Sequence, residues 1–274
     1  METIQSTVNS PQSTANSEEP TANSQQPAAN KPVIEIINLK KSFGSQVVLK
    51  DVSLKLFNGE NLVVLGKSGT GKSVLIKCIV GLLSSDSGTI NVFDKNVLEM
   101  KRKELDELRT KIGFLFQSGA LYDSMTVRQN LEFPLLRIRK ELSSQEVEEK
   151  IKEVLENVGL ADAIDKMPSQ LSGGMRKRIS LARTIVVDPQ IMLYDEPTTG
   201  LDPVTSDEIS ALILDVQKKY KTSSIIITHD IECAITVANR IIMLDAGGVY
   251  KEGKPEDFKT STDPLIQSFF KKSH

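Results

Sequence analysis

The sequence is poor in cysteine and tryptophan and has no long apolar run. Its 274 residues include two cysteines and no tryptophan, and two thiols are too few for a disulfide framework. Because Cys78 and Cys233 both lie in runs typical of helices, we expect them to be buried packing residues rather than reactive groups. No segment approaches the roughly 18 apolar residues that a membrane-spanning helix needs. Any membrane role is therefore expected to be exercised from the surface.

An excess of charge of one sign is also missing. The formal net charge is -2, from 34 Lys and Arg against 36 Asp and Glu. This balance disfavours a nucleic-acid binder that is held by phosphate neutralisation. Apolar residues at 39% and charged residues at 26% are ordinary for a globular protein, and the length allows one large domain with an inserted lobe.

The first 30 residues lack the apolar content of a folded domain. They are rich in Ser, Thr, Asn, Gln and Pro, and their only charges are Glu2, Glu18 and Glu19. Such a composition cannot bury a core, so residues 1–32 are predicted to form a disordered tail that acts as a tether. Without a basic start or an apolar segment, the tail resembles neither a secretory signal nor a transit peptide.

The most informative stretch is a glycine-rich loop between the apolar run 62–65 and a helix-like run that starts at residue 74. Its residues are Gly66, Lys67, Ser68, Gly69, Thr70, Gly71, Lys72 and Ser73. Glycines let main-chain amides approach anionic oxygens, and the start of a helix favours anions. Lys72 can reach the outer phosphates, and the Ser73 hydroxyl can ligate Mg²⁺. The loop therefore predicts a site for a nucleoside triphosphate with magnesium.

Hydrophobic periodicity predicts how this loop is embedded. Strands are expected at 33–39, 52–56, 112–116, 191–194 and 224–227, and the first two form an antiparallel region ahead of the loop. From residue 118 the pattern changes to helices. The first is expected at 127–133 and should stop at Pro134, the second is expected at 143–158, and a third is expected from the Ser-Gly-Gly sequence at 172 through 187. The charged run 101–109 predicts a solvated helix without a ligand. The chain is thus predicted to be an α/β core with an inserted helical lobe at about 118–180.

Several residues outside the loop are candidates for binding or catalysis, and most have an ordinary alternative. Phe43 is expected in a short loop between the first two strands, where it could stack on a base or simply pack in a turn. Ser172, Gly173 and Gly174 could form a second anion site at a helix start or only cap that helix. Asp195 and Glu196 directly follow a buried strand, where acids are costly unless they serve a magnesium nucleotide. His229 ends a neighbouring strand and could contact the outer phosphate, although a single histidine is usually structural.

Taken in this order, the motifs resemble the nucleotide-binding subunit of ATP-binding cassette (ABC) transporters over about residues 33–255. The resemblance implies a P-loop NTPase ABC cassette with a RecA-like core, an N-terminal antiparallel β region and an inserted α-helical lobe. Residues 256–274 would be a short helical tail. The substrate would be ATP with Mg²⁺, hydrolysed by two copies stacked head to tail.

The resemblance also implies a role for each matching residue. Phe43 would stack on adenine, and residues 66–73 would hold the phosphates. The ligands of Mg²⁺ would be Ser73, Gln117 and Asp195, and the ATP of the second copy would be contacted by Ser172, Gly173 and Gly174. Glu196 would polarise water, while Lys72 and His229 would contact the γ-phosphate. Two positions depart from the family pattern, since Met175 replaces the usual Gln and Phe43 the usual Tyr. Neither change removes a phosphate contact.

Residues 115–122 and 167–178 look like the Mla-type ATPases, which energise lipid movement across the bacterial envelope. This narrower resemblance implies a permease, a mammalian-cell-entry domain protein and a small regulatory subunit as partners, at the cytoplasmic face of the inner membrane. Two alternatives stay open, namely an importer of a polar solute such as an amino acid and a mechanical signalling cassette of the cell-division type. DNA-repair and translation cassettes are disfavoured by the single compact cassette and the weak net charge.

Overall fold

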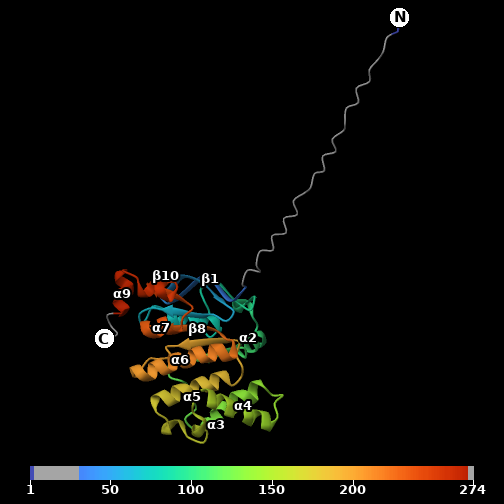
Figure 1. Ribbon diagram of the computed structural model, residues 1–274, viewed down its shortest axis with the longest axis vertical. Coiled ribbons are helices and arrows are strands. Elements are labelled where there is room, and N and C mark those ends of the chain that lie inside the picture. The colour runs from blue at the N-terminus through green and yellow to red at the C-terminus, as the bar shows by residue number, and fades with distance from the viewer. Residues whose placement is uncertain (3–30, 271–274) are drawn as a thin grey trace.

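The computed structural model describes residues 1–2 and 31–270. The tail predicted at 1–32 therefore falls almost wholly outside the described residues, as do residues 271–274. The two bodies visible in Figure 1 are a sheet-containing core and a helical lobe at its lower end that carries α3, α4 and α5. No helix among the described residues combines the length and the apolar content needed to cross a bilayer.

The core is built on one ten-stranded sheet in the order β5-β4-β1-β2-β10-β9-β3-β8-β7-β6. The strands are β1 Pro32–Phe43, β2 Gln46–Phe57, β3 Asn61–Leu65, β4 Ser87–Val92, β5 Lys95–Asn96, β6 Ile112–Leu115, β7 Ile191–Asp195, β8 Ser223–Thr228, β9 Arg240–Asp245 and β10 Gly248–Gly253. Strands β1, β2, β4 and β5 pair antiparallel, which confirms the predicted β region, whereas β9, β3, β8, β7 and β6 pair parallel. Asp51 of β2 and Gly248 of β10 pair where the two halves meet.

Strands β3, β7 and β8 are buried along their whole length, as expected for parallel strands that helices cover on both faces. Alternate side chains of β3 enter two hydrophobic clusters. Leu62 and Val64 pack with residues of α1 and α2, whereas Val63 and Leu65 pack with residues of α5, α6 and α7. Because β3, β8 and β7 are parallel neighbours, the loops that follow them meet at one edge of the sheet.

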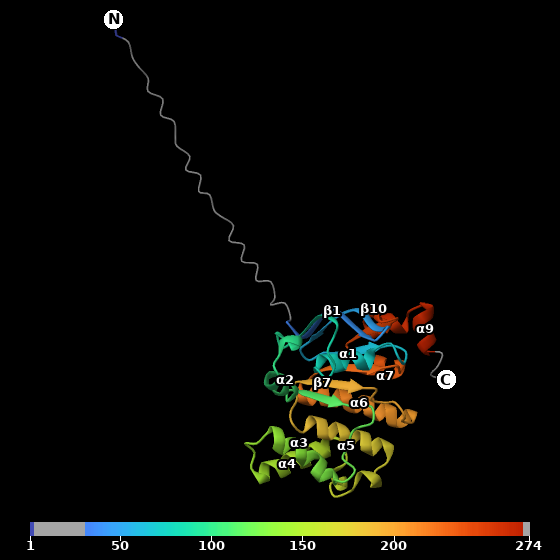
Figure 2. The same cartoon turned by 180° about the vertical axis from the view of Figure 1, so that it is seen from behind.

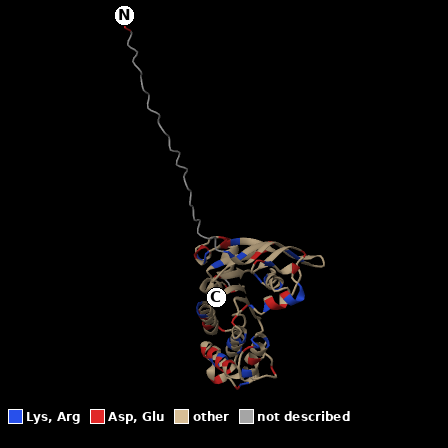
Figure 3. Ribbon diagram, turned by 90° about the vertical axis from the view of Figure 1, so that its right-hand side faces the viewer, with Lys and Arg blue, Asp and Glu red and all other residues tan. Residues whose placement is uncertain are grey.

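The helices are α1 Lys72–Ile79, α2 Arg102–Arg109, α3 Val127–Ile138, α4 Ser144–Asn157, α5 Gly173–Ile185, α6 Pro203–Tyr220, α7 Ile231–Val237, α8 Pro255–Lys259 and α9 Pro264–Phe270, with 3-10 turns at Val97–Glu99, Ala161–Ala163 and Pro168–Gln170. Figure 2 shows α1 beside the sheet, and Figure 3 shows that charges of both signs occur on the core and on the lobe. Both cysteines are buried, as predicted, and burial raises the pKa of the Cys78 thiol to about 11 and that of Cys233 to about 12.

The lobe follows its predicted helices with two corrections. Helix α3 does not stop at Pro134 but continues to Ile138. A proline inside a helix removes one main-chain hydrogen bond and costs about 3 kcal/mol. Leu131 and Leu135, on either side of the proline, are fully buried on one helix face, and their packing outweighs that cost. Helix α5 also ends at Ile185, two residues before the predicted end.

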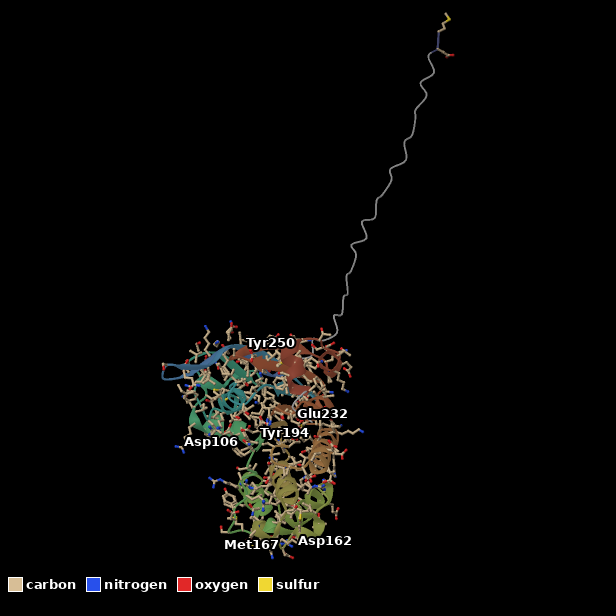
Figure 4. The ribbon with its side chains drawn as sticks, turned by 90° about the vertical axis from the view of Figure 1, so that its left-hand side faces the viewer. Asp106, Asp162, Met167, Tyr194, Glu232 and Tyr250 are labelled. Atoms are coloured by element: carbon tan, nitrogen blue, oxygen red, sulfur yellow. The ribbon has the colours of Figure 1, made fainter. Side chains whose placement is uncertain are left out.

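The segment that follows β10 forms two helices, α8 and α9, which pack on the core. Phe258 and Ile266 are fully buried in the same cluster as Leu65 of the loop strand. Tyr250 donates a hydrogen bond to Asp263 at 2.7 Å. Figure 4 shows Tyr250 at the end of the molecule opposite Met167 of the lobe, with Tyr194 between them.

Candidate functional site

The glycine-rich loop joins β3 to α1, as the sequence predicts. At Gly66 an added Cβ atom would lie 2.7 Å from the Thr70 Oγ1 and 2.8 Å from the Leu244 main-chain oxygen. At Gly71 φ is 95°, and a Cβ atom would lie 2.6 Å from the Leu49 Cδ2. Glycine is therefore required on steric grounds at Gly66, and on both steric and conformational grounds at Gly71. The tip of the loop at Lys67 and Ser68 is exposed, so a phosphate group can reach it.

Lys72, the first residue of α1, has a side chain that is only 5% exposed. Its Nζ donates to the main-chain oxygens of Gly66 at 2.7 Å and Lys67 at 3.1 Å, and it lies 3.3 Å from the Glu196 Oε1. The ammonium group thus folds back over the loop and makes an ion pair with Glu196, the residue that follows β7. A cation in this place fits the charge of a triphosphate on the same loop.

Ser73 and Asp195 are brought together next to this lysine. The Ser73 hydroxyl donates to the Asp195 Oδ1 at 3.0 Å, and burial raises the pKa of the Asp195 carboxyl. Hydroxyl and carboxylate oxygens are the ligand types that Mg²⁺ prefers, so this pair fits a magnesium ion. The described residues contain no cluster of three or more His, Cys, Asp or Glu side chains that could hold a metal. A magnesium ion would therefore depend on the phosphates for much of its coordination.

Glu196 follows Asp195 and has a left-handed backbone, with φ at 51°. Its Oε2 accepts hydrogen bonds from the Thr199 Oγ1 at 3.1 Å and the His229 main-chain N–H at 3.3 Å, and it lies 2.8 Å from the His229 Nδ1. Backbone strain of this kind persists only where the surroundings fix the residue, and it is common at active sites. The structure thus unites three predicted residues, Lys72, Glu196 and His229, in one contact group.

Ser172 caps helix α5, since its Oγ accepts a hydrogen bond from the Met175 N–H at 3.2 Å. Ser172 and Gly173 are exposed. A cavity of about 840 Å³ opens beside the loop, and its lining includes Lys67, Ser68 and His229 but not residues 172–174. The exposed helix start is therefore not part of this cavity in a single chain, and its contact with a second copy stays a prediction.

Phe43 and Gln117 are placed differently from the other candidates. Phe43 is the last residue of β1 rather than a loop residue, because the hairpin turn begins only at Gly44. Its side chain is 47% exposed, and the Lys41 Nζ lies 5.3 Å from the centre of the ring. Gln117 follows β6 and is exposed. Its predicted magnesium role stays a prediction.

A Phe43→Ala substitution is expected to weaken ATP binding by about 1 to 3 kcal/mol, the contribution of stacking one base on one ring. A titration with a fluorescent ATP analogue would measure the change in Kd. Ile37→Ala is a matched control because it removes an exposed apolar side chain from the same strand. An unchanged Kd for Phe43→Ala would assign the ring to packing.

Sequence reasoning missed two residues that the structure adds to the site. Thr199 holds the Glu196 carboxylate, as described above, and Lys177 of α5 reaches the turn that carries Glu196. Lys177 is 5% exposed and shares one helix face with the buried Ser180 and Leu181, three and four residues further on. A lysine within the apolar face of a predicted helix is a signal that could have identified it.

A strand, a glycine-rich loop and a helix, with acids at the end of a second parallel strand that only β8 separates from the first, define a P-loop nucleoside triphosphatase. A family model described as ABC transporter matches residues 49–199. The chain belongs to this family, whose ATP-binding cassettes hydrolyse ATP to drive transport.

Three relatives show how wide the similarity is. The probable ribonucleotide transport ATP-binding protein mkl of Mycobacterium leprae is 43% identical over 236 residues, which cover 86% of this chain and 68% of that protein. The chloroplastic protein TRIGALACTOSYLDIACYLGLYCEROL 3 of Arabidopsis thaliana is 38% identical, over 86% of this chain and 73% of that protein. The methionine import ATP-binding protein MetN of Rhizobium etli is 37% identical, over 81% and 61%. The chain thus spans about two thirds of the length of these relatives.

Solved structures agree with the fold. The dimeric ATP-binding cassette MJ0796 bound to ADP and Pi has a TM-score of 0.74 and 31% identity, and the match covers 81% of this chain and 98% of that one. The structure of cbiO1 from Clostridium perfringens, described as part of an ABC transporter complex, has a TM-score of 0.77 and 27% identity, over 89% and 99%. These matches confirm the predicted ABC cassette fold.

Proposed function

We propose that this chain is the ATPase subunit of a lipid transporter and that two copies, stacked head to tail, bind and hydrolyse MgATP between them. The observation that carries the ATPase assignment is the contact group at the end of β7. There the Glu196 carboxylate lies within 3.3 Å of the Lys72 ammonium and is fixed by Thr199 and His229. A carboxylate that is oriented beside a phosphate loop can accept a proton from an attacking water molecule.

The residues of the chain divide this chemistry among them. Gly66 to Ser73 would bind the phosphates through main-chain amides and the Lys72 ammonium, and the ring of Phe43 would hold the base. Ser73, Asp195 and Gln117 would hold Mg²⁺, which supplies charge neutralisation at the phosphates when bound. His229 would keep the Glu196 carboxylate aimed at the water and contact the γ-phosphate. Each of these groups lowers the barrier by positioning or by opposing the charge that develops in the transition state.

The proposal of a homodimer is supported by the position of the helix start at Ser172. This capped start, with Gly173 and Gly174 behind it, is exposed and lies outside the cavity beside the phosphate loop. Helix starts attract anions, so an exposed one on the lobe fits the ATP that another copy holds. The cassette MJ0796, similar over 98% of its own length, is described as dimeric.

Lipid as the transported substrate is supported by the segments 115–122 and 167–178, which resemble Mla-type ATPases, and by similarity to a plant protein that is named after a galactolipid. The proposed partners are a membrane permease and a mammalian-cell-entry domain protein, with a small regulatory subunit in addition, at the cytoplasmic face of the bacterial inner membrane. The similarity to the methionine import protein favours a second candidate, an importer of a polar solute.

Copurification of the complex distinguishes these functions. The chain would be expressed with its neighbouring membrane subunits, purified by an affinity tag on the chain, and the bound small molecules identified by mass spectrometry. Stoichiometric phospholipid on the permease, above the level retained by an unrelated membrane protein in the same detergent, supports the lipid assignment. A bound amino acid or nucleotide supports a polar-solute importer. A membrane partner that carries no substrate and drives no movement indicates a signalling cassette.

A further inference from the structure

Lys177 is a buried cation that contacts two turns of the active site. It lies in the second turn of α5, the helix that Ser172 caps, and its side chain is 5% exposed. The Nζ donates to the main-chain oxygen of Gln117 at 2.8 Å and to that of Glu196 at 3.3 Å. Burial lowers the pKa of this lysine, although the charges of Asp195 and Glu196 oppose the shift. A lysine is rarely buried to this degree unless its donors are engaged.

The two acceptors belong to segments that the lobe itself does not contain. Gln117 follows β6 and Glu196 follows β7, and these strands are parallel neighbours in the core sheet. The donor comes from the helix whose capped start is the proposed contact with the second copy. A single ammonium group therefore joins the lobe helix to both turns, at a point where the lobe meets the nucleotide site.

The contact with Glu196 is made at a strained position. A left-handed backbone is unfavourable for a glutamate, so the surrounding hydrogen bonds must hold it. The Glu196 main-chain N–H donates to the main-chain oxygen of Ile227 at 2.9 Å. The main-chain oxygen of Glu196 accepts from the Lys177 Nζ at 3.3 Å and from the Thr199 main-chain N–H at 3.4 Å. The ammonium group is thus one of the bonds that keep this backbone, and hence the direction of the carboxylate, in place.

We propose that Lys177 is a positioning residue, whose ammonium group couples the placement of helix α5 to the direction of the Glu196 carboxylate and to the turn at Gln117. This inference rests on the proposed role of Glu196. When the lobe moves relative to the core, the ammonium group pulls on the two carbonyl groups and reorients the turns that carry them. If Lys177 only satisfied these carbonyls as a structural residue, its substitution would lower turnover and stability together.

The test compares substitutions of this lysine in the full chain, assayed with its copurified membrane subunits. Lys177→Met keeps the length of the side chain but removes its charge and its donors, whereas Lys177→Gln keeps donors for one carbonyl. Arg178→Met is the matched control, because it removes a cation from the next position of α5, where Arg178 pairs with Glu208 on the surface. The readouts are kcat for ATP hydrolysis, the Kd for ATP and the melting temperature.

For Lys177→Met we expect kcat to fall by about 10- to 100-fold, since a small misplacement of a catalytic group has an effect of this size. The Kd for ATP should stay within about threefold, because no phosphate contact is removed. Lys177→Gln should recover part of the rate, and Arg178→Met should keep it.

Two results would overturn the inference. One is a folded Lys177→Met variant with wild-type kcat. The other is a loss in which kcat, ATP affinity and melting temperature fall together and Lys177→Gln recovers none of them, because this pattern identifies a structural residue. If the Met variant does not fold, the Gln variant decides, since wild-type kcat there would overturn the coupling. An inactive wild-type complex would instead contradict the proposed function itself.

Discussion

Glu196→Gln is expected to reduce ATP turnover by about 100-fold or more while MgATP binding persists. The amide keeps the size of the carboxylate but cannot accept the proton of the attacking water, and general-base catalysis contributes about 10²- to 10⁴-fold to a rate. The residues that would bind the phosphates, Lys72 and the glycine-rich loop, are unchanged. ATP that binds but is not hydrolysed should therefore accumulate between two copies and hold them together.

The measurement has two parts. Phosphate release under steady state gives the rate, and size-exclusion chromatography with light scattering, with and without MgATP, gives the oligomeric state. Glu141→Gln is a suitable control because this exposed carboxylate pairs with Arg139 on the lobe surface. Turnover near the wild-type rate in Glu196→Gln would remove the residue from its proposed role.

Lys72→Ala is expected to weaken ATP binding by about 10- to 100-fold and to abolish measurable hydrolysis. Hydrogen bonds from a charged group are worth about 1.5 to 3 kcal/mol, and each 1.4 kcal/mol corresponds to about tenfold in affinity. The effect on the rate should exceed the effect on binding, because negative charge develops on the phosphate oxygens as the bond breaks. The substitution also removes the cation that lies 3.3 Å from the Glu196 carboxylate.

Isothermal titration with ATP and the phosphate-release assay check this expectation. Lys103→Ala serves as the control, since Lys103 is exposed on α2, the charged helix to which the sequence assigns no ligand. If Lys72→Ala bound and hydrolysed ATP like the wild type, the phosphate-binding role of the loop would be refuted.

The core and the phosphate loop were predictable because local sequence determines them. The strand 62–65, the glycines and the Lys72-Ser73 pair are adjacent in the chain, so one short pattern describes them together. The acids at 195 and 196 could be placed because an apolar run precedes them and parallel strands end at one edge. Their contacts with Ser73 and Lys72 follow from the sheet order, in which only β8 lies between β7 and β3.

What the sequence did not predict depends on contacts between distant segments. The sequence predicts that the helix starting at residue 127 ends at Pro134, because proline is unfavourable inside a helix. The burial of Leu131 and Leu135 instead stabilises a helix that continues past the proline. The role of Lys177 was not predicted, because its two carbonyl acceptors come from residues 60 and 19 positions away. Phe43 was assigned to a loop because the strand pattern fades before the hairpin turn.

The position of Phe258 and Ile266 has a consequence for how the protein is made. Both side chains fill the cluster that also covers Leu65 and Val63 of the loop strand. During synthesis β3 leaves the ribosome long before α8 and α9 do, so one side of the nascent sheet lacks its final cover while translation continues. An exposed apolar surface of this kind favours aggregation, and the newly made chain should therefore depend on chaperones until these late helices have docked.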